Sequence, residues 1–291
     1  AALAVAEGSL VIQRLDAVAA LFLALAFFAA VRKKPFLLGL AGGAVFAVKL
    51  LPAVALPVLL AADPSAWRDA KSWLRATAGA LVAIAIGLFP IFLAPGALSA
   101  MLSYHASRGL QVETTFATLL GTMRWLSGSA VGSAQSFGSA NLSDATALVL
   151  AKLCTPLTVI AIAVVGLVAF RAAPGSANEA PLARVERMAR ALLGAVVLLW
   201  IFSKVLSPQY FTWALPLALA IPFPSGKKAV FAFVAALVVT QIYMRAYYES
   251  VAHQEPIGLV TMLVRQALLA LLAWVTLAPL SKAPRVVDLA A

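Results

Sequence analysis

Charged residues are scarce in this sequence. They make up 11% of its 291 residues, whereas 63% of the residues are hydrophobic. A soluble globular domain carries about 25% charged residues, so a water-soluble fold, which would have to bury so much apolar surface, is excluded. The apolar runs do not alternate polar and apolar residues with period two, which excludes transmembrane β-strands. Because a helix satisfies its own backbone hydrogen bonds in lipid, the composition predicts an all-α, polytopic membrane helix bundle.

Cysteine and histidine are also nearly absent. The single Cys154 excludes an internal disulfide and a cysteine-based metal cluster. Two histidines without closely spaced carboxylates give no support for a divalent metal, and no other cofactor is indicated. The chain has no Walker loop, Rossmann glycine pattern or nucleophile elbow, which argues against an ATP-driven transporter.

The net charge of +11 would suit nucleic acid, but its distribution argues otherwise. The basic residues cluster in short loops between apolar runs, as in proteins whose partners are membrane lipids. We therefore expect a multi-pass protein of the cell membrane and no nucleic-acid partner. The chain opens with Ala1 rather than Met and lacks the basic start of a signal peptide. We expect residues 1–291 to be a single transmembrane domain truncated at its N-terminus.

Apolar runs predict about nine helices, two of which are short legs. Lys49, Pro52 and Pro57 break the run 35–62, because proline removes a helical donor. This run could form one kinked span or two short legs. The predicted helices are 16–31, 36–48, 52–62, 76–93, 145–170, 189–206, 211–223, 229–247 and 257–280.

The positive-inside rule favours the two legs over the single span. With two legs, 14 of the 22 basic residues fall on the inner side. This topology gives an outer loop at 94–144 and an inner loop at 171–188. Within the outer loop, residues 98–126 have helical spacing that predicts an interfacial amphipathic helix. The Gly/Ser-rich residues 127–143 predict a flexible segment.

Two polar segments interrupt the apolar chain. The first polar segment, residues 104–113, reads YHASRGLQVE, and the second polar segment, residues 204–213, reads KVLSPQYFTW. Each combines a cation with hydrogen-bonding side chains and aromatic rings, and both fall on the outer side of the two-leg topology. Because a charge near the bilayer centre costs about 2.5–3.5 kcal/mol on insertion scales, we expect these segments to bind an anionic, polar molecule.

Eight basic residues lie away from the predicted inner loops. We expect Lys152, Arg245 and Arg265 to snorkel to lipid headgroups, whereas Lys49 lies between two short legs and cannot reach far. Glu113 could pair with Arg108. Local pairing is also expected between Arg14 and Asp16, at the start of the first run. The eight are Arg14, Lys49, Arg108, Arg124, Lys152, Lys204, Arg245 and Arg265.

These polar segments resemble those of family-87 glycosyltransferases, and the resemblance covers most of the chain. It is carried by RGLQVE after an aromatic-His start, and by Ser207-Pro208-Gln209-Tyr210 followed by Trp213 and Pro216. The Arg14-Leu15-Asp16 opening and the Lys49-Leu50-Leu51-Pro52 break fit the same pattern. Such enzymes have the C-type glycosyltransferase fold, and mannosyltransferases are the best-known members.

The resemblance implies a reaction and a set of residues. A sugar, mannose or another hexose, would pass with inversion from a polyprenyl-phosphate donor to a lipid or glycan acceptor at the outer face. A carboxylate would act as general base. The implied donor phosphate and sugar site comprises Lys49, His105, Arg108, Lys204, Gln209 and Tyr210. Supporting residues would be Arg14, Asp16, Gln111 and Glu113.

One departure from the family pattern concerns the base. Enzymes of this fold place the catalytic Asp in the first outer loop, after the first helix, and that stretch has no counterpart in this sequence. Neither Glu7 nor Asp16 matches the position, so we expect the base to lie upstream of Ala1. Two alternatives stay open: a lipid-linked-sugar transporter or flippase, which would need a polar path to the inner face, and a non-catalytic membrane subunit.

Overall fold

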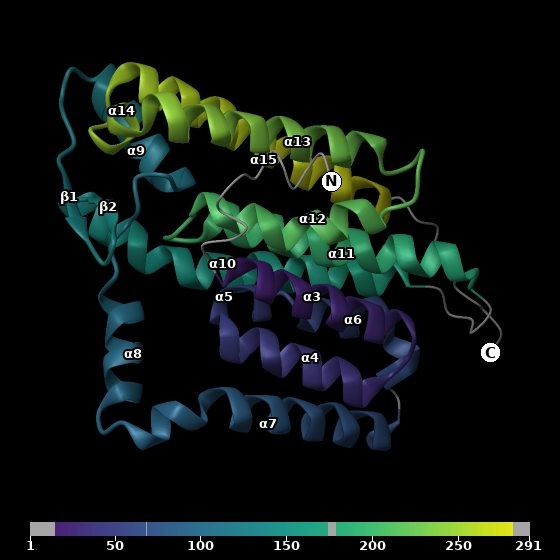
Figure 1. Ribbon diagram of the computed structural model, residues 1–291. Coiled ribbons are helices and arrows are strands. Elements are labelled where there is room, and N and C mark those ends of the chain that lie inside the picture. Colours follow the sequence, from purple (N-terminus) through teal and green to yellow (C-terminus); the bar gives the residue numbers. More distant parts are fainter. Residues whose placement is uncertain (1–14, 68, 174–178, 282–291) are drawn as a thin grey trace.

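The computed structural model describes residues 15–67, 69–173 and 179–281. Most helices lie side by side in one bundle, and a small hairpin with α8 closes one end of it (Figure 1). The elements are α3 (Asp16–Val31), α4 (Pro35–Val48), α5 (Leu50–Ala53), α6 (Pro57–Ala62), η1 (Pro64–Trp67), α7 (Ala70–Leu93), α8 (Ala97–Ser107), α9 (Thr115–Leu126), β1 (Ser133–Ser136), β2 (Ser139–Leu142), α10 (Ala145–Ala172), α11 (Pro181–Phe202), η2 (Pro208–Tyr210), α12 (Phe211–Ala220), α13 (Lys227–Ile242), η3 (Tyr243–Tyr247), α14 (Tyr248–Ala252) and α15 (Pro256–Ser281).

Four stretches of helix are long and apolar enough to cross a membrane. They are Ala70–Ile91, Ala145–Ala172, Lys227–Ala252 and Pro256–Ser281. Each exceeds the roughly 20 residues that a span needs. This confirms the all-α class and suggests a multi-pass membrane protein. Helical segments outnumber the nine predicted, because the second leg is divided into α5 and α6 and the outer loop contains α8 and α9.

The run 35–62 forms two legs. The first leg, α4, ends where Lys49 adopts an extended backbone, and the second leg, α5 with α6, runs back beside it. Leu38 of α4 and Leu59 of α6 line the same cavity, and so do Lys34 and Asp63. The chain therefore reverses direction between the legs, as the two-leg topology predicts.

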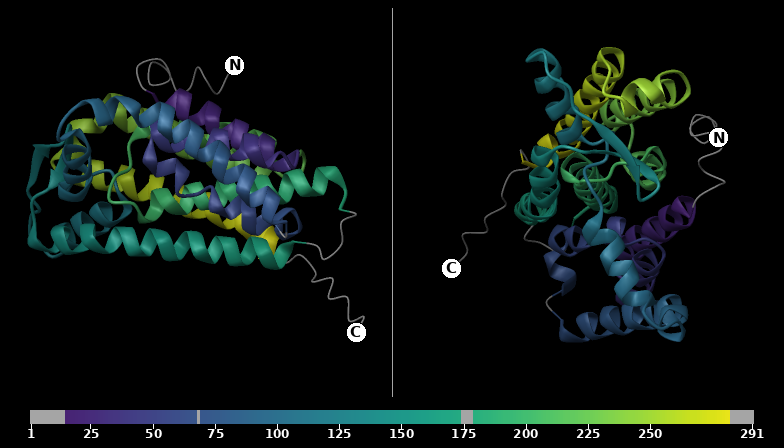
Figure 2. Two further views of the ribbon diagram at one scale, coloured as in Figure 1. Left: turned by 90° about the horizontal axis from the view of Figure 1, so that it is seen from below. Right: turned by 90° about the vertical axis from the view of Figure 1, so that its left-hand side faces the viewer.

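Helix α7 packs on α4 through small residues. A methyl group added to Gly39 would lie 1.8 Å from the carbonyl oxygen of Ala76, and one added to Gly79 would lie 2.2 Å from that of Phe36. Small residues permit such close helix contacts in membranes. Figure 2 (right) shows α7, in blue, at the edge of the molecule farthest from α13 and α15.

The centre of the bundle is α11, and its start corrects the predicted inner loop 171–188. Helix α10 continues to Ala172 and α11 begins at Pro181, which occupies the favoured first position of a helix. The predicted helix 189–206 therefore begins eight residues too late, and it also ends too late, because α11 stops at Phe202. Arg187 and Arg190 are buried rather than solvated. Arg190 donates to the carbonyl oxygens of Ser225 and Val275.

Residues 127–143 are not the flexible loop that their Gly/Ser content predicts. They include an antiparallel hairpin in which Ser133 pairs with Leu142 and Ser136 with Ser139. Phe137 and Gly138 form its tip with positive φ angles of 54° and 70°, a backbone typical of two-residue hairpin turns. The side-chain amide of Asn141 also donates to the Ser136 carbonyl oxygen at 2.8 Å.

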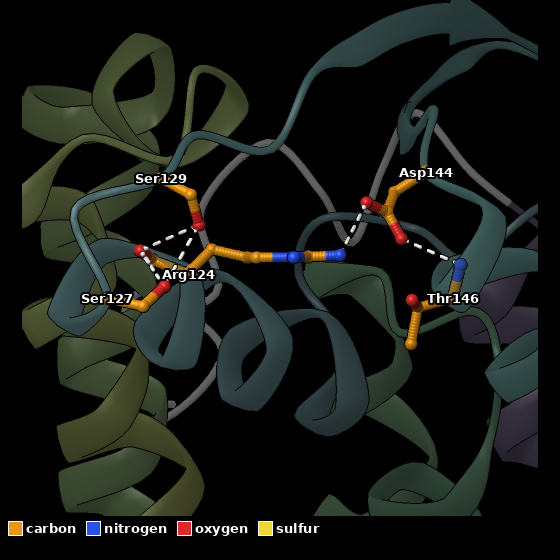
Figure 3. Close-up of polar contacts among 5 residues, drawn as sticks. All are labelled: Arg124, Ser127, Ser129, Asp144 and Thr146. Carbon is orange, nitrogen blue, oxygen red and sulfur yellow. Dashed lines mark hydrogen bonds and ion pairs between the residues drawn. The ribbon is translucent and has the colours of Figure 1, made fainter.

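An ion pair ties this hairpin region to its neighbouring helices (Figure 3). Arg124, near the end of α9, reaches Asp144 at 3.1 Å. Asp144 caps α10 by accepting a hydrogen bond from the Thr146 amide at 2.7 Å. Ser127 and Ser129 both donate to the Arg124 carbonyl oxygen. The arrangement therefore connects the end of α9 to the start of α10 on either side of the hairpin.

Candidate functional site

Both polar segments border one cavity of about 1080 Å³. We call the end of the bundle that holds it the cavity end; it includes Lys49, residues 104–113 and residues 203–210. The opposite end, which includes Lys33, Lys34 and Arg184, we call the basic end. Arg184 donates there to the Ala30 carbonyl oxygen at 3.3 Å and pairs with Asp63.

Backbone hydrogen bonds bring the two polar segments together. The Gln111 amide donates to the Lys204 carbonyl oxygen at 3.0 Å. The Leu206 amide donates to the Gln111 side-chain oxygen at 3.1 Å. On its other side, the first polar segment bonds β2, since the Val112 amide donates to the Ala140 carbonyl oxygen at 3.1 Å. The first polar segment thus lies between the hairpin and the second polar segment.

Among the described residues, three cations besides Lys49 line the cavity. Arg108 donates to the Ser139 hydroxyl at 3.3 Å, and its Nε is buried without a partner among the described residues. Lys204 donates to the Ala106 carbonyl oxygen at 3.3 Å. The third is Lys152 of α10. Grouped cations and an unsatisfied guanidinium nitrogen suit an anionic ligand.

The electrostatics of this group agree with such a role. Partial burial lowers the pKa of Lys204, and the charge of Arg108 contributes to the same direction. His105 also has a lowered pKa, first because of burial and then because Arg108 and Lys204 repel a proton. An anion bound among these groups would relieve their mutual repulsion.

Lys49 and Asp16 form one corner of the site. Lys49 Nζ donates to both Asp16 carboxylate oxygens at 2.7 Å, and Trp213 Nε1 donates to Asp16 at 2.8 Å. The rings of Tyr210 and Trp213 stack 4.1 Å apart, and Lys49 Nζ lies 4.9 Å from the Tyr210 ring centre. Burial raises the pKa of Tyr210 to about 12, so its hydroxyl remains a donor.

Glu113 lies in a buried polar network, and the expected Glu113–Arg108 pair does not form. The Glu113 carboxylate accepts hydrogen bonds from the side-chain amide of Gln111 and from the Tyr243 hydroxyl. Arg265 donates to Tyr243 and to the Glu113 carbonyl oxygen, each at 3.0 Å. Arg265 is fully buried, so the snorkelling interpretation of this residue is wrong: its guanidinium makes hydrogen bonds inside the protein.

The cavity also has an apolar arm. We give this name to the apolar part of its lining, which includes Leu50, Leu51, Val54, Val159 of α10 and Leu199 of α11. Because α10 is long and apolar enough to cross a membrane, part of this lining belongs to a candidate membrane span. The cavity therefore combines a cationic centre with an apolar extension, which suits an amphipathic ligand.

Most residues named from the sequence border this cavity. Asp16 does not line it but lies behind Lys49, and Arg14 lies outside the described residues. Lys152, which was expected to snorkel to lipid headgroups, lines the cavity instead; a lone cation inside an apolar span is costly in lipid, which could have indicated this. Tyr248, which also lines the cavity, was not identified from the sequence. The predicted residues that line the cavity are Lys49, His105, Arg108, Gln111, Glu113, Lys204, Gln209 and Tyr210.

No protein-family model, curated protein or solved structure matches this chain.

Proposed function

We propose that this chain is the membrane domain of a glycosyltransferase, similar to those of family 87 and with their C-type fold. It would transfer a hexose, such as mannose, from a polyprenyl-phosphate donor to a lipid or glycan acceptor at the outer face of the cell membrane. One observation carries the proposal: a single cavity has a cationic centre and an apolar arm lined in part by a candidate membrane span. That combination matches a lipid-linked phosphate.

The parts of the cavity suit the parts of this donor. Arg108, Lys152 and Lys204 would hold the phosphate through charge-assisted hydrogen bonds, each worth about 1.5–3 kcal/mol. The apolar arm would take the first prenyl units. Gln209 and His105 offer hydrogen-bonding groups for the sugar. When the sugar is transferred, the phosphate gains negative charge, which the same cations would stabilise.

The two ends of the bundle favour an enzyme over a transporter. A transporter needs a route from the cavity end to the basic end. Along that direction lies a tightly packed α11, in which Leu192, Leu193, Val196 and Trp200 are fully buried. At the basic end, Arg184 joins the end of α3 to Asp63. The cavity therefore suits a substrate that enters from one side of the membrane.

Ligand binding tests the proposal directly. The protein in lipid nanodiscs is titrated with polyprenyl phosphate and with neutral polyprenol of the same length. We expect the phosphate to bind at least tenfold more tightly, because about 1.4 kcal/mol corresponds to a factor of ten. A second assay follows transfer of labelled hexose from polyprenyl-phosphate hexose to membrane lipid extracts. Equal affinity for phosphate and alcohol, together with no transfer, would reject the function.

A further inference from the structure

Glu113 is the only carboxylate among the described residues that line the cavity. Its side chain is nearly buried, with 3% of its surface exposed. A carboxylate offers about four lone-pair positions. The side-chain amide of Gln111 donates to one oxygen of Glu113 and the Tyr243 hydroxyl donates to the other, so two of these positions are used. The Glu113 carboxylate therefore keeps acceptor capacity beyond these two hydrogen bonds.

The surroundings of Glu113 differ from those of an ordinary structural ion pair. Its carboxylate is not in direct contact with a guanidinium; Tyr243 lies between it and Arg265. Tyr243 begins the π-helical segment η3, and short π-helical segments occur frequently at functional sites. Met244 and Tyr248, from η3 and α14, also border the cavity, and the Glu113 charge acts on Tyr248.

We propose that the Glu113 carboxylate accepts the proton of the acceptor hydroxyl, which binds in the cavity between Glu113 and the cationic centre. The inference rests on the proposed glycosyltransferase function and assigns its base within this chain. The hydroxyl O–H bond breaks and its proton moves to Glu113. The acceptor oxygen forms a bond to sugar C1, the C1–O bond to phosphate breaks, and polyprenyl phosphate leaves with that electron pair.

The surroundings of Glu113 shift its pKa in opposing directions. Burial raises its pKa, while Arg265, the Tyr243 and Gln111 hydrogen bonds and Arg108 oppose that rise. Tyr248 of α14 and Tyr210 of η2 also face this charge. A raised pKa makes the carboxylate a stronger proton acceptor, and the neighbouring cations keep its ionised form accessible.

The first test compares Glu113→Gln with the wild type, using the complete protein in nanodiscs. Removing a general base costs about 10²- to 10⁴-fold in rate. We therefore expect hexose transfer to fall by at least 100-fold while polyprenyl-phosphate affinity changes by less than about threefold, within about 0.7 kcal/mol. Transfer by Glu113→Gln within threefold of the wild type would overturn the assignment but leave the proposed function intact.

The second test measures how the rate of transfer depends on pH. If Glu113 had only a structural role, its pKa would not set the acidic limb of this profile. The Tyr243 hydrogen bond favours the ionised carboxylate, so Tyr243→Phe should raise the Glu113 pKa further. The acidic limb of the kcat/KM profile should then move to higher pH. An unmoved limb would overturn the assignment. Donor binding by the wild type without any transfer would also overturn it, because the base would then lie outside this chain; absence of both binding and transfer would reject the function itself.

Discussion

At the scale of single residues, the cations of the cavity are the groups with the most direct consequence for binding. Arg108→Ala and Lys204→Ala should each weaken polyprenyl-phosphate binding by about 10- to 100-fold, because each removes a charge-assisted bond worth about 1.5–3 kcal/mol. Lys71→Ala is the control, since Lys71 is an exposed cation of α7 away from the cavity. If the Arg108/Lys204 double variant bound with wild-type affinity, both residues would be interface anchors instead.

Asp16 has a different role, which is to support the site from behind. It is 1% exposed and accepts hydrogen bonds from Lys49 and Trp213. Breaking a buried pair costs about 3–5 kcal/mol. Because Lys49 is 25% exposed, we expect Asp16→Asn to lower stability by an amount at or below the lower end of that range.

Thermal unfolding in detergent measures this loss. Asp144→Asn is a matched control, because Asp144 is 20% exposed, far more than Asp16, in its pair with Arg124, and asparagine caps a helix as well as aspartate does. We expect a clear decrease in Tm for Asp16→Asn and little change for Asp144→Asn. Equal effects would mean that burial does not set the strength of the Asp16 contacts.

At the scale of elements, the packing of α7 against α4 depends on glycines, which have no side chain. A Cβ on Gly39 would lie 1.8 Å from the Ala76 carbonyl oxygen, whereas one on Gly166 of α10 would lie 3.7 Å from its nearest neighbour, Ala61. Gly39→Ala should therefore push α7 away from α4, at a cost of about 1–3 kcal/mol or more. Gly166→Ala should be neutral or slightly stabilising, because alanine favours helices.

Thermal unfolding of these two glycine variants, with a cysteine cross-link between α4 and α7, measures the effect. The cross-link yield should fall in Gly39→Ala alone. Unchanged stability and cross-linking in Gly39→Ala would show that the two helices can separate slightly without cost, contrary to the close packing described above.

The elements also show what can be predicted from sequence. Apolar runs located α3, α4, α7, α10 and α15, because span length and hydropathy dominate in lipid. The start of α11 was missed, since its first turns contain arginines that donate to carbonyl oxygens of other helices. The hairpin was missed as well. Its Gly/Ser composition gives no apolar pattern, and its order comes from backbone pairing and Asn141 side-chain bonds.

At the scale of the whole molecule, the site is assembled from distant parts of the chain. The sequence predicted that both polar segments share a side of the membrane, because charge distribution constrains topology. It could not predict that Arg265 would bond Glu113, which lies 152 positions away. No periodicity or local spacing relates these residues. A buried cation in a span only indicates that some partner exists.

The two ends of the bundle predict the result of chemical labelling across the membrane. Ser107 is exposed at the cavity end, whereas Ser225 is exposed at the basic end, where its carbonyl oxygen accepts from Arg190. Cys154 is buried and is the only cysteine of the chain, so Cys154→Ala provides a background without thiols. In that background, Ser107→Cys and Ser225→Cys each introduce one thiol.

Because basic segments stay inside, an impermeant thiol reagent should label position 107 on intact cells. It should label position 225 only after permeabilisation. Labelling of 225 but not 107 would place the cavity on the inner side and exclude an outer-face transfer. A single span over residues 35–62 would give that result, because it reverses the side of every later loop. Labelling of both positions on intact cells would also contradict the two-leg topology, because the two positions would then lie on the same side. Labelling therefore tests the membrane orientation separately from the chemistry of the cavity.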